Sequence, residues 1–288
     1  FGMTQAYCIG IFMVMTEMAL ETTSAMRINN KGVRMKAVRV RDLVLGTGIP
    51  KICVPIVSTE KNKILNEIEQ LNKTEHDLIE LRIDYFEYYS HIDSIIELLK
   101  EVRKIYFKPI IFTFRTKDEG GMNFIDEDEY FKINNYVAES ELVDLIDIEL
   151  FKPENKITEF IEAAHKNNIR VILSNHDFYK TPDKEEILNR MLRMQLLGAD
   201  ISKIAVMPKS ENDVLTLLSA GLEMKQMKNL KADRPFIALS MGSLGTITRA
   251  ASEFLGSCIT YASLNNNSAP GQLSVDDTRE IMRILHNN

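Results

Sequence analysis

The sequence predicts an α/β fold in which eight strand–helix units close into a (β/α)8 TIM barrel. From residue 51 onward, eight short apolar runs rich in β-branched residues alternate with longer stretches of helical periodicity. Successive runs begin 23 to 34 residues apart, which is the spacing of one strand and its helix. The 254 residues from Met35 to Asn288 also match the length of about 250 residues typical of one such barrel.

Each apolar run is expected to form one barrel strand. The runs are KICVPIV (51–57), LIELRIDYF (78–86), PIIFTFRT (109–116), LVDLIDIEL (142–150), RVILSNHDF (170–178), ISKIAVMP (201–208), PFIALSMG (235–242) and CITYASL (258–264). An open dinucleotide-binding sheet needs a glycine-rich turn after its first strand, but the sequence there is STEKNK (58–63). The lack of glycine at this turn favours the closed barrel.

The residues that precede the first run predict a hairpin and a domain boundary. VRVRDLVLG (38–46) alternates like a short β-hairpin, which we expect to close the bottom of the barrel. Residues 35–288 are expected to form a single catalytic domain. Residues 1–34 are expected to be an N-terminal extension or an added leader. Their apolar run at 6–15 is too short to cross a bilayer, and no basic residue precedes it as in a signal peptide.

The composition is that of an ordinary globular protein. Hydrophobic residues make up 45% of the chain and charged residues 26%, which excludes disordered and fibrous classes. The net charge of −6 argues against a nucleic-acid partner, and no membrane partner is expected. Cys8, Cys53 and Cys258 are far apart and form no Cys-x-x-Cys pair. We therefore expect no disulfide framework and no zinc site, and a location in the reducing cytoplasm.

Strand alternation places charged side chains inside the expected barrel. Alternate residues of a barrel strand face the axis, and chemistry gathers at the carboxyl ends of the strands. Glu80, Arg82 and Asp84 share the polar face of the second strand, and Asp147 and Glu149 share a face of the fourth. The mouth of the barrel is therefore expected to hold a charged site.

Lys203 is a candidate Schiff-base residue because it lies inside the apolar sixth strand. A buried lysine is costly unless it is paired or neutral, and desolvation and nearby positive charge both lower its pKa. A lowered pKa makes the amine nucleophilic. The alternative is a lysine whose ammonium reaches solvent from the strand edge. His176 is the candidate proton carrier because imidazole titrates near neutral pH, although most histidines are structural or solvated.

Arg82, Arg115 and Arg249 are expected near the same mouth, where guanidinium groups suit a carboxylate or phosphate ligand. The alternative is that they neutralise internal carboxylates, and we expect some of the three to do so. The loops GGMN (120–123) and NNNSAPGQ (265–272) are candidate lids, although plain solvent loops of this composition are commoner.

The chain resembles the type I 3-dehydroquinate dehydratases in five segments that occur in the family's order. These are FTFRTKDEGG (112–121), DLIDIELF (144–151), SNHDF-x-KTP (174–182), KIAVMP (203–208) and SAPGQ (268–272). The resemblance runs from Met35 to the C-terminus and implies a TIM-barrel lyase of the shikimate pathway. Such an enzyme dehydrates 3-dehydroquinate to 3-dehydroshikimate by syn elimination through an imine, as a homodimer and with no metal or organic cofactor.

The resemblance also implies roles for individual residues. Lys203 matches the lysine that condenses with the C3 ketone. His176 matches the general acid/base that removes the C2 proton and protonates the departing C1 hydroxyl, and Glu119 matches the residue that orients it. Arg249 matches the arginine that binds the substrate carboxylate. The remaining matches surround the substrate hydroxyls or close the lid, and they are Glu80, Arg82, Arg115, Ser268 and Gln272.

A few positions depart from the family pattern. Pro55 and Tyr179 stand where a serine and a histidine are expected, and Leu239 replaces a methionine. Gly242-Ser243-Leu244 replaces a segment that usually carries a lysine. None of these is one of the three catalytic matches, so the departures bear on secondary pocket contacts and not on the class of reaction.

Three other functions compete with the dehydratase. A class I aldolase shares the barrel and the strand lysine, and its phosphate cradle could draw on residues 242–245. A divalent-metal isomerase or lyase could use Glu80, Asp147, Glu149 and His176, but three nearby arginines disfavour it. A non-catalytic quinate- or shikimate-sensing module should lack one of the three catalytic matches, and the sequence has all of them.

Overall fold

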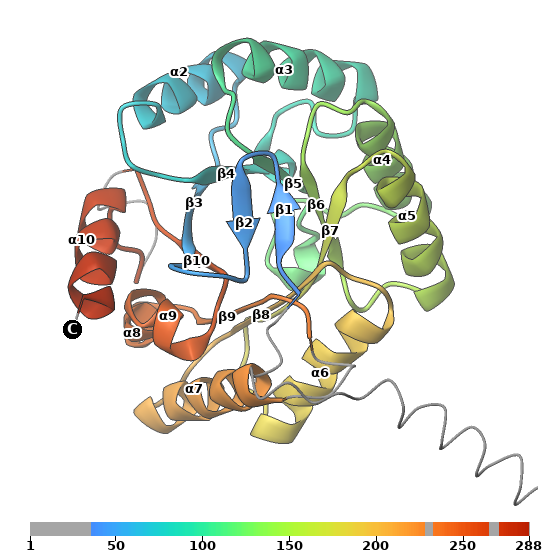
Figure 1. Ribbon diagram of the computed structural model, residues 1–288. Coiled ribbons are helices and arrows are strands. Elements are labelled where there is room, and N and C mark those ends of the chain that lie inside the picture. The colour runs from blue at the N-terminus through green and yellow to red at the C-terminus, as the bar shows by residue number, and fades with distance from the viewer. Residues whose placement is uncertain (1–35, 228–232, 265–270, 288) are drawn as a thin grey trace, which may run out of the picture. The chain divides into compact units, whose positions relative to one another are not determined.

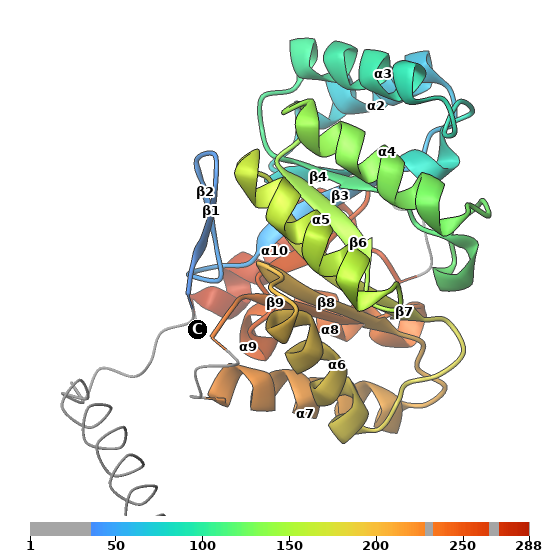
Figure 2. The same ribbon diagram turned by 90° about the vertical axis from the view of Figure 1, so that its right-hand side faces the viewer.

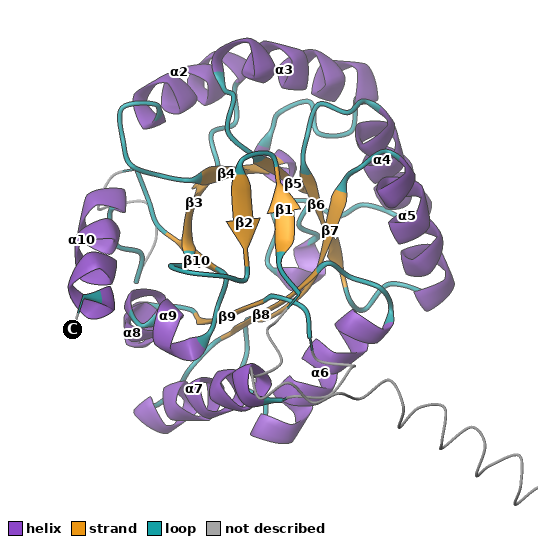
Figure 3. Ribbon diagram, viewed as in Figure 1, coloured by secondary structure: helices purple, strands orange, loops and turns teal. Residues whose placement is uncertain are grey.

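Eight parallel strands form a ring that helices surround (Figures 1 and 3). The structure, a computed structural model, describes residues 36–227, 233–264 and 271–287. The strand order is β10-β3-β4-β5-β6-β7-β8-β9. The ring closes between its end strands, where the N–H of Cys258 donates to the carbonyl oxygen of Phe236 at 2.8 Å. The predicted (β/α)8 barrel is confirmed.

Each barrel strand is followed by its helix. The strands are β3 (Lys51–Ile56), β4 (Leu78–Arg82), β5 (Ile110–Thr113), β6 (Leu145–Glu149), β7 (Arg170–Asp177), β8 (Ile201–Val206), β9 (Phe236–Ser240) and β10 (Ile259–Tyr261). The helices are α2 (Lys61–Leu71), α3 (Ile92–Ile105), α4 (Glu127–Glu139), α5 (Glu154–Lys166), α6 (Lys184–Leu196), α7 (Glu211–Gln226), the pair α8 (Thr246–Ala250) and α9 (Ser252–Leu255), and α10 (Val275–His286). Asp126, Asp183 and Ser274 begin three helices by accepting a backbone N–H of the first turn.

Alternation along the strands separates an apolar bottom layer from a charged layer above it. The inward side chains nearest the strand starts pack in one buried cluster, which includes Leu78, Ile111, Leu145, Ile172, Ile201, Ile237 and Ile259. One inward step further along β4, β6, β7 and β8 stand the polar or charged groups Glu80, Asp147, Ser174 and Lys203. The outward residues pack under the helices. Charged groups thus gather toward the carboxyl ends of the strands.

A two-stranded antiparallel hairpin closes the opposite end of the barrel. It consists of β1 (Val38–Val40) and β2 (Leu43–Leu45). Its side chains Val38, Val40 and Leu45 are buried in the same cluster as the apolar bottom layer. Figure 2 shows the hairpin beside the barrel end from which the strands start. The predicted closure of the barrel bottom is therefore confirmed.

The second barrel strand is shorter than its apolar run predicts. Expected to reach residue 86, β4 ends at Arg82, and Ile83–Tyr85 form the 3-10 turn η1. The reason is Asp84, whose buried carboxylate accepts the backbone N–H groups of Arg115 at 3.3 Å and Met122 at 3.2 Å. A continued strand could not turn this carboxylate toward the next βα loop.

Some expectations concern residues outside the described part of the chain. The extension or leader at residues 1–34 and the substrate contact at Ser268 both lie there. The single catalytic domain over 35–288 therefore also stays a prediction. Along the described ranges, no helix combines the length and the apolar character needed to span a bilayer.

We predict that Leu45→Ala destabilises the fold by about 2–5 kcal/mol, because it opens a cavity where the hairpin meets the barrel bottom. Leu45 is fully buried there. Denaturant unfolding of the variant measures the loss. Leu285→Ala is the matched control, because that side chain is 54% exposed and its removal should change stability little. Equal stabilities of the two variants would contradict the role of the hairpin as part of the core.

Candidate active site

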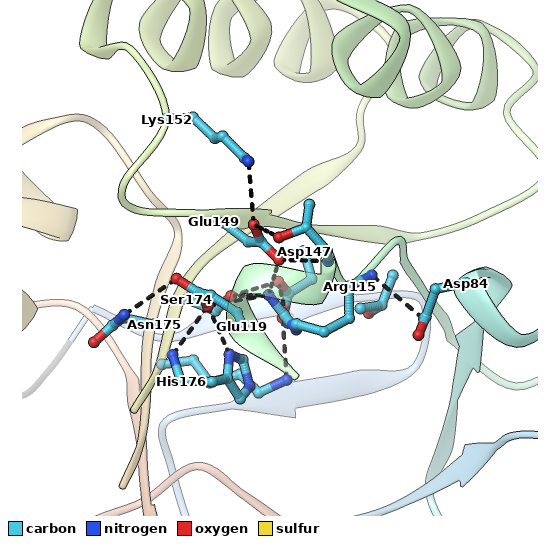
Figure 4. Close-up of polar contacts among 12 residues, drawn as sticks. Asp84, Arg115, Glu119, Asp147, Glu149, Lys152, Ser174, Asn175 and His176 are labelled. Carbon is cyan, nitrogen blue, oxygen red and sulfur yellow. Dashed lines mark hydrogen bonds and ion pairs between the residues drawn. The ribbon is translucent and has the colours of Figure 1, made fainter. Parts of the chain in front are cut away.

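The charged side chains of the mouth come from alternate barrel strands and form one hydrogen-bonded network (Figure 4). Glu80 lies in β4, Asp147 and Glu149 in β6, and Lys203 in β8. All four are buried, with almost no contact with solvent. Since a buried charge is costly without a partner, the way these groups pair determines what the site can do.

Lys203 is paired with two carboxylates at the centre of the barrel. Its Nζ donates to Glu80 Oε1 at 2.9 Å and to Asp147 Oδ2 at 3.0 Å, and it lies 4.8 Å from the centre of the Tyr261 ring. Burial lowers the pKa of this ammonium, but Asp147 and Glu80 outweigh burial and raise the pKa above the usual lysine value. The expectation of a lowered pKa is therefore wrong for the free protein, which holds Lys203 as a cation. The alternative of a lysine reaching solvent is also wrong, since the side chain is 4% exposed.

Arg115 joins this pair to the rest of the network. Its Nη2 donates to Asp147 Oδ1 at 2.7 Å, and its Nη1 donates to Glu149 Oε1 at 3.1 Å and to Ser174 Oγ at 3.0 Å. Burial lowers the pKa of Arg115, yet the surrounding carboxylates raise it well above its usual value. In the free protein this guanidinium thus acts as a permanent cation that neutralises internal carboxylates.

The other two arginines differ from each other. Arg82 makes a bidentate pair with Asp84, with both N···O distances at 2.8 Å. Arg249 is buried, and its Nη1 donates to the carbonyl oxygen of Ser240 at 2.8 Å. Its Nε finds no hydrogen-bond partner, and no ion pair to it occurs among the described residues. Burial lowers the pKa of Arg249 to about 10, which leaves it charged at neutral pH and suited to an incoming anion.

Glu119 reaches the site because the loop after β5 folds back tightly. It ends the 3-10 turn η2 (Lys117–Glu119), and Gly120 follows with a left-handed φ of 82°. A side chain on Gly121 would place a Cβ 1.9 Å from the carbonyl oxygen of Arg115, so this fold-back requires glycine. Glu119 Oε2 lies 3.0 Å from both the backbone nitrogen and the Nδ1 of His176. These direct contacts support the prediction that Glu119 orients His176.

The pKa values of Glu119 and His176 are shifted in opposite directions. Burial raises the pKa of Glu119 to about 8, with Arg115 opposing the rise and Glu149 adding to it. Burial, Arg115 and Lys203 lower the pKa of His176 well below its usual value. Below about pH 8 the pair thus carries one extra proton, and above it the neutral imidazole donates Nδ1–H to the carboxylate. Nε2 is then free to accept a proton, and the same pair can later return it.

Two cavities lie at the mouth, and the smaller of them is lined by the Glu119–His176 pair. One of about 550 Å³ lies over the ends of β3 and β4 and is lined by Arg82, Gln272 and the departing residue Pro55. A second, of about 280 Å³, is lined by Glu119, His176 and Tyr179, whose side chain is 80% exposed. Of the remaining departures, Leu239 is buried with the apolar bottom layer. Pro55 and Tyr179 thus line cavities at the mouth, whereas Leu239 belongs to the apolar interior.

The structure brings most of the predicted site residues into one network. Lys203 and His176 are connected through Asp147, Arg115 and Glu119. Gln272 lies at the mouth, and Ser268 lies outside the described residues. The network also contains Asp147, Glu149, Ser174 and Asn175, which were missing from the predicted site residues. Strand parity already placed Asp147 and Glu149 on an inward face, whereas no signal pointed to Asn175 because its strand position faces outward.

Comparisons with known proteins agree with this geometry. The family model for type I 3-dehydroquinase matches residues 52–288. The 3-dehydroquinate dehydratase of Clostridium novyi is 45% identical over 254 residues, which cover 88% of this chain and 99% of that protein. The enzyme of Clostridium kluyveri is 47% identical over 250 residues, which cover 86% of this chain and 97% of that protein.

Solved structures give the same result. The crystal structure of type I 3-dehydroquinate dehydratase from Clostridium difficile, which contains covalently modified comenic acid, superposes with a TM-score of 0.84. It is 44% identical and covers 88% of this chain and 99% of its own. The 3-dehydroquinate dehydratase of Enterococcus faecalis is 38% identical, with a TM-score of 0.79 and coverage of 86% and 98%. The chain belongs to the type I 3-dehydroquinase family.

Proposed function

We propose that Lys203, His176 and Glu119 carry out the dehydration of 3-dehydroquinate in this family member. The activity itself, that of a type I 3-dehydroquinate dehydratase of the shikimate pathway, follows from membership of the family. The observation that carries the assignment is an amino group enclosed in the barrel, with two carboxylates and an aromatic ring beside it. The relative from Clostridium difficile, crystallised with covalently modified comenic acid, agrees with covalent chemistry in this family.

Lys203 forms the covalent bond to the substrate. Its ammonium first gives up a proton, and Glu80 and Asp147 are both within hydrogen-bond distance to receive it. The free amine then adds to the C3 ketone, and loss of one water leaves a protonated imine. The imine draws electrons from the adjacent C2–H bond, so the C2 proton becomes acidic enough for a neutral base to remove.

His176 moves the proton that elimination requires. With Nδ1–H donated to Glu119, its Nε2 takes the C2 proton and leaves an enamine. The protonated ring then gives this proton to the C1 hydroxyl, which leaves as a second water. One water returns to hydrolyse the conjugated imine and release Lys203. The balance is one substrate to one product and one water, with the same group acting as base and as acid, as a syn elimination requires.

The remaining predicted residues orient the ring. Arg249 has a buried guanidinium with no carboxylate partner in the described part of the chain, so we assign it the substrate carboxylate. Arg82 and Gln272 line the larger cavity, where they can bind the hydroxyl groups of the substrate ring. The resemblance implies the same task for Ser268, which lies outside the described residues. Glu80 and Arg115 hold Lys203 and the neighbouring carboxylates in place.

The competing functions fit less well. An aldolase phosphate cradle would draw on residues 242–245, but Gly271 packs so closely there that a Cβ would lie 1.9 Å from the carbonyl oxygen of Gly242. This turn thereby anchors the end of the SAPGQ segment. For a metal enzyme, the carboxylates of Glu80, Asp147 and Glu149 are already bound by Lys203 and Arg115. Ligand sensing alone does not require Lys203, His176 and Glu119 in this arrangement.

We also propose the homodimer and the cytoplasmic location that the sequence led us to expect. Exposed apolar side chains on the last helices support self-association, among them Ile247, Phe254 and Ile284. Cys53 and Cys258 are free and buried, in keeping with a reducing compartment.

We predict that Lys203→Ala abolishes turnover, because no other group can form the imine. Borohydride reduction of the wild-type protein with 3-dehydroquinate should attach the substrate to Lys203, as peptide mapping by mass spectrometry can check. Lys225→Ala is a matched control on α7, where Nζ contacts only backbone carbonyls of α9. Full activity of Lys203→Ala, or an adduct on another side chain, would end the assignment.

We predict that His176→Ala still traps a borohydride adduct on Lys203 but turns over about 10²–10⁴ times more slowly, because only proton transfer is impaired. Steady-state kinetics and adduct mapping on the same preparation separate the two steps. His165→Ala serves as the control, since that histidine pairs with Asp200 on the surface, away from the site. Normal turnover of His176→Ala would remove His176 from its role.

We predict that kcat/KM rises with pH and reaches half of its plateau near pH 8. The sign follows from the raised pKa of Glu119, because the base form of the pair exists only after the shared proton has left. Initial rates across about pH 6 to 9.5, with protein stability checked at each pH, give the profile. A flat or falling profile over this range would contradict the shared-proton description of the pair.

A further inference from the structure

A side chain outside the barrel interior contacts the general acid/base pair. Asn175 precedes His176 in β7, and its strand face is that of Val171 and Leu173, which pack under the helices. Nevertheless its Nδ2 donates to Glu119 Oε1 at 3.1 Å (Figure 4). The two oxygens of Glu119 are thus held by consecutive residues, Oε1 by Asn175 and Oε2 by His176.

Helix α6 fixes the other end of this amide. Arg190 Nη1 donates to Asn175 Oδ1 at 2.8 Å, and Arg190 Nε donates to Glu186 Oε1 at 2.6 Å. The guanidinium carbon also lies 5.3 Å from the centre of the Phe151 ring. Arg190 is therefore anchored on both sides, and its side chain is 15% exposed.

We propose that Arg190 and Asn175 are positioning residues that hold the Glu119 carboxylate in its hydrogen-bond-accepting state against His176. The inference rests on the proposed function, since it assigns this task within the same proton-transfer unit. The two ends of an asparagine amide have nearly the same shape, so shape alone does not fix its orientation. Arginine can only donate, and so it binds the oxygen end and leaves the NH2 end for Glu119.

The orientation of the Asn175 amide matters because Glu119 interacts with charges of both signs, Arg115 and Glu149. A reversed amide would place its oxygen against Glu119 Oε1 and would favour the protonated carboxyl, in which Nε2 of His176 cannot act as a base. The donated hydrogen bond from Asn175 lowers the pKa of Glu119, against burial and Glu149, which raise it. The charged and titratable groups that face Glu119 or line the cavity beside it are Arg115, Asp118, Glu149, Lys152, His176, Asp177, Tyr179 and Arg190.

The decisive measurement is the pH profile of kcat/KM in Asn175→Leu, Asn175→Asp and Arg190→Leu. Loss of a hydrogen bond to an ionised carboxylate raises its pKa by about one to two units. The midpoint of the rising limb should therefore move to higher pH by about one to two units in Asn175→Leu. Asn175→Asp should move it at least as far, because a second carboxylate then faces Glu119. In Arg190→Leu the limb should move in the same direction by a smaller amount.

Two further variants separate positioning from general damage. Arg190→Lys keeps a side chain that only donates, and its limb should stay within about half a unit of wild type. Arg193→Leu is the matched control on the same helix, since Arg193 is 43% exposed and pairs only with Glu154, and its profile should be unchanged. Thermal melts confirm that each variant is folded.

The outcomes distinguish this inference from the proposed function. A wild-type protein that forms no borohydride adduct on Lys203 overturns the proposed function and this inference together. An adduct on Lys203 in every variant, with activity lowered equally at all pH values and the limb unmoved, overturns only the positioning role. If the rising limb of the pH profile moves in Asn175→Leu but the profile of Arg190→Leu is that of wild type, Arg190 has no part in the positioning role. Limb shifts in both variants, with rescue by Arg190→Lys, support the proposal.

Discussion

The carboxylate of Asp147 binds two buried cations, Lys203 and Arg115, and the rest of the site depends on this pairing. It accepts from Lys203 on one oxygen and from Arg115 and Ser174 on the other, with no exposure to solvent. Burial raises the pKa of Asp147, but Arg115 and Lys203 lower it overall, so the group remains charged. Removing one member of such a set leaves an uncompensated buried charge, which is costly. The apolar bottom layer and the hairpin exclude water beneath it.

The same pairing suits the imine chemistry that we propose for Lys203. A lysine ammonium and a protonated imine carry the same charge at nearly the same place, so Glu80 and Asp147 stabilise both. The enamine that forms between the first and the second imine has no charge on the Lys203 nitrogen. At that stage Glu80 and Asp147 face no positive charge on this nitrogen. Departure of the hydroxyl restores the cation, and so the carboxylates favour the forward elimination. A raised lysine pKa is therefore consistent with catalysis through a cationic intermediate, although it delays the first attack.

Periodicity alone predicts the barrel, the hairpin and the inward face of each strand, because these follow from which residues alternate. It does not predict the charge of Lys203, because that depends on Asp147 and Glu80, which lie 56 and 123 residues away in sequence. Parity indicates that both carboxylates face the barrel axis. It does not indicate that the stagger of the strands places them within hydrogen-bond distance of Lys203. The end of β4 was missed for a related reason, since Asp84 binds backbone from a different loop.

Asn175 shows where the alternation rule stops being a guide to function. Within a strand, a residue that faces the helices cannot reach the barrel axis. At the end of β7, however, the turn η2 lies over the strand and brings Glu119 within reach of both faces, of Asn175 and of His176. A helix layer that elsewhere only covers the sheet can there influence proton transfer, through Arg190. The carboxyl ends of barrel strands therefore present both strand faces to the chemistry, and residues of either parity belong in the search for functional groups.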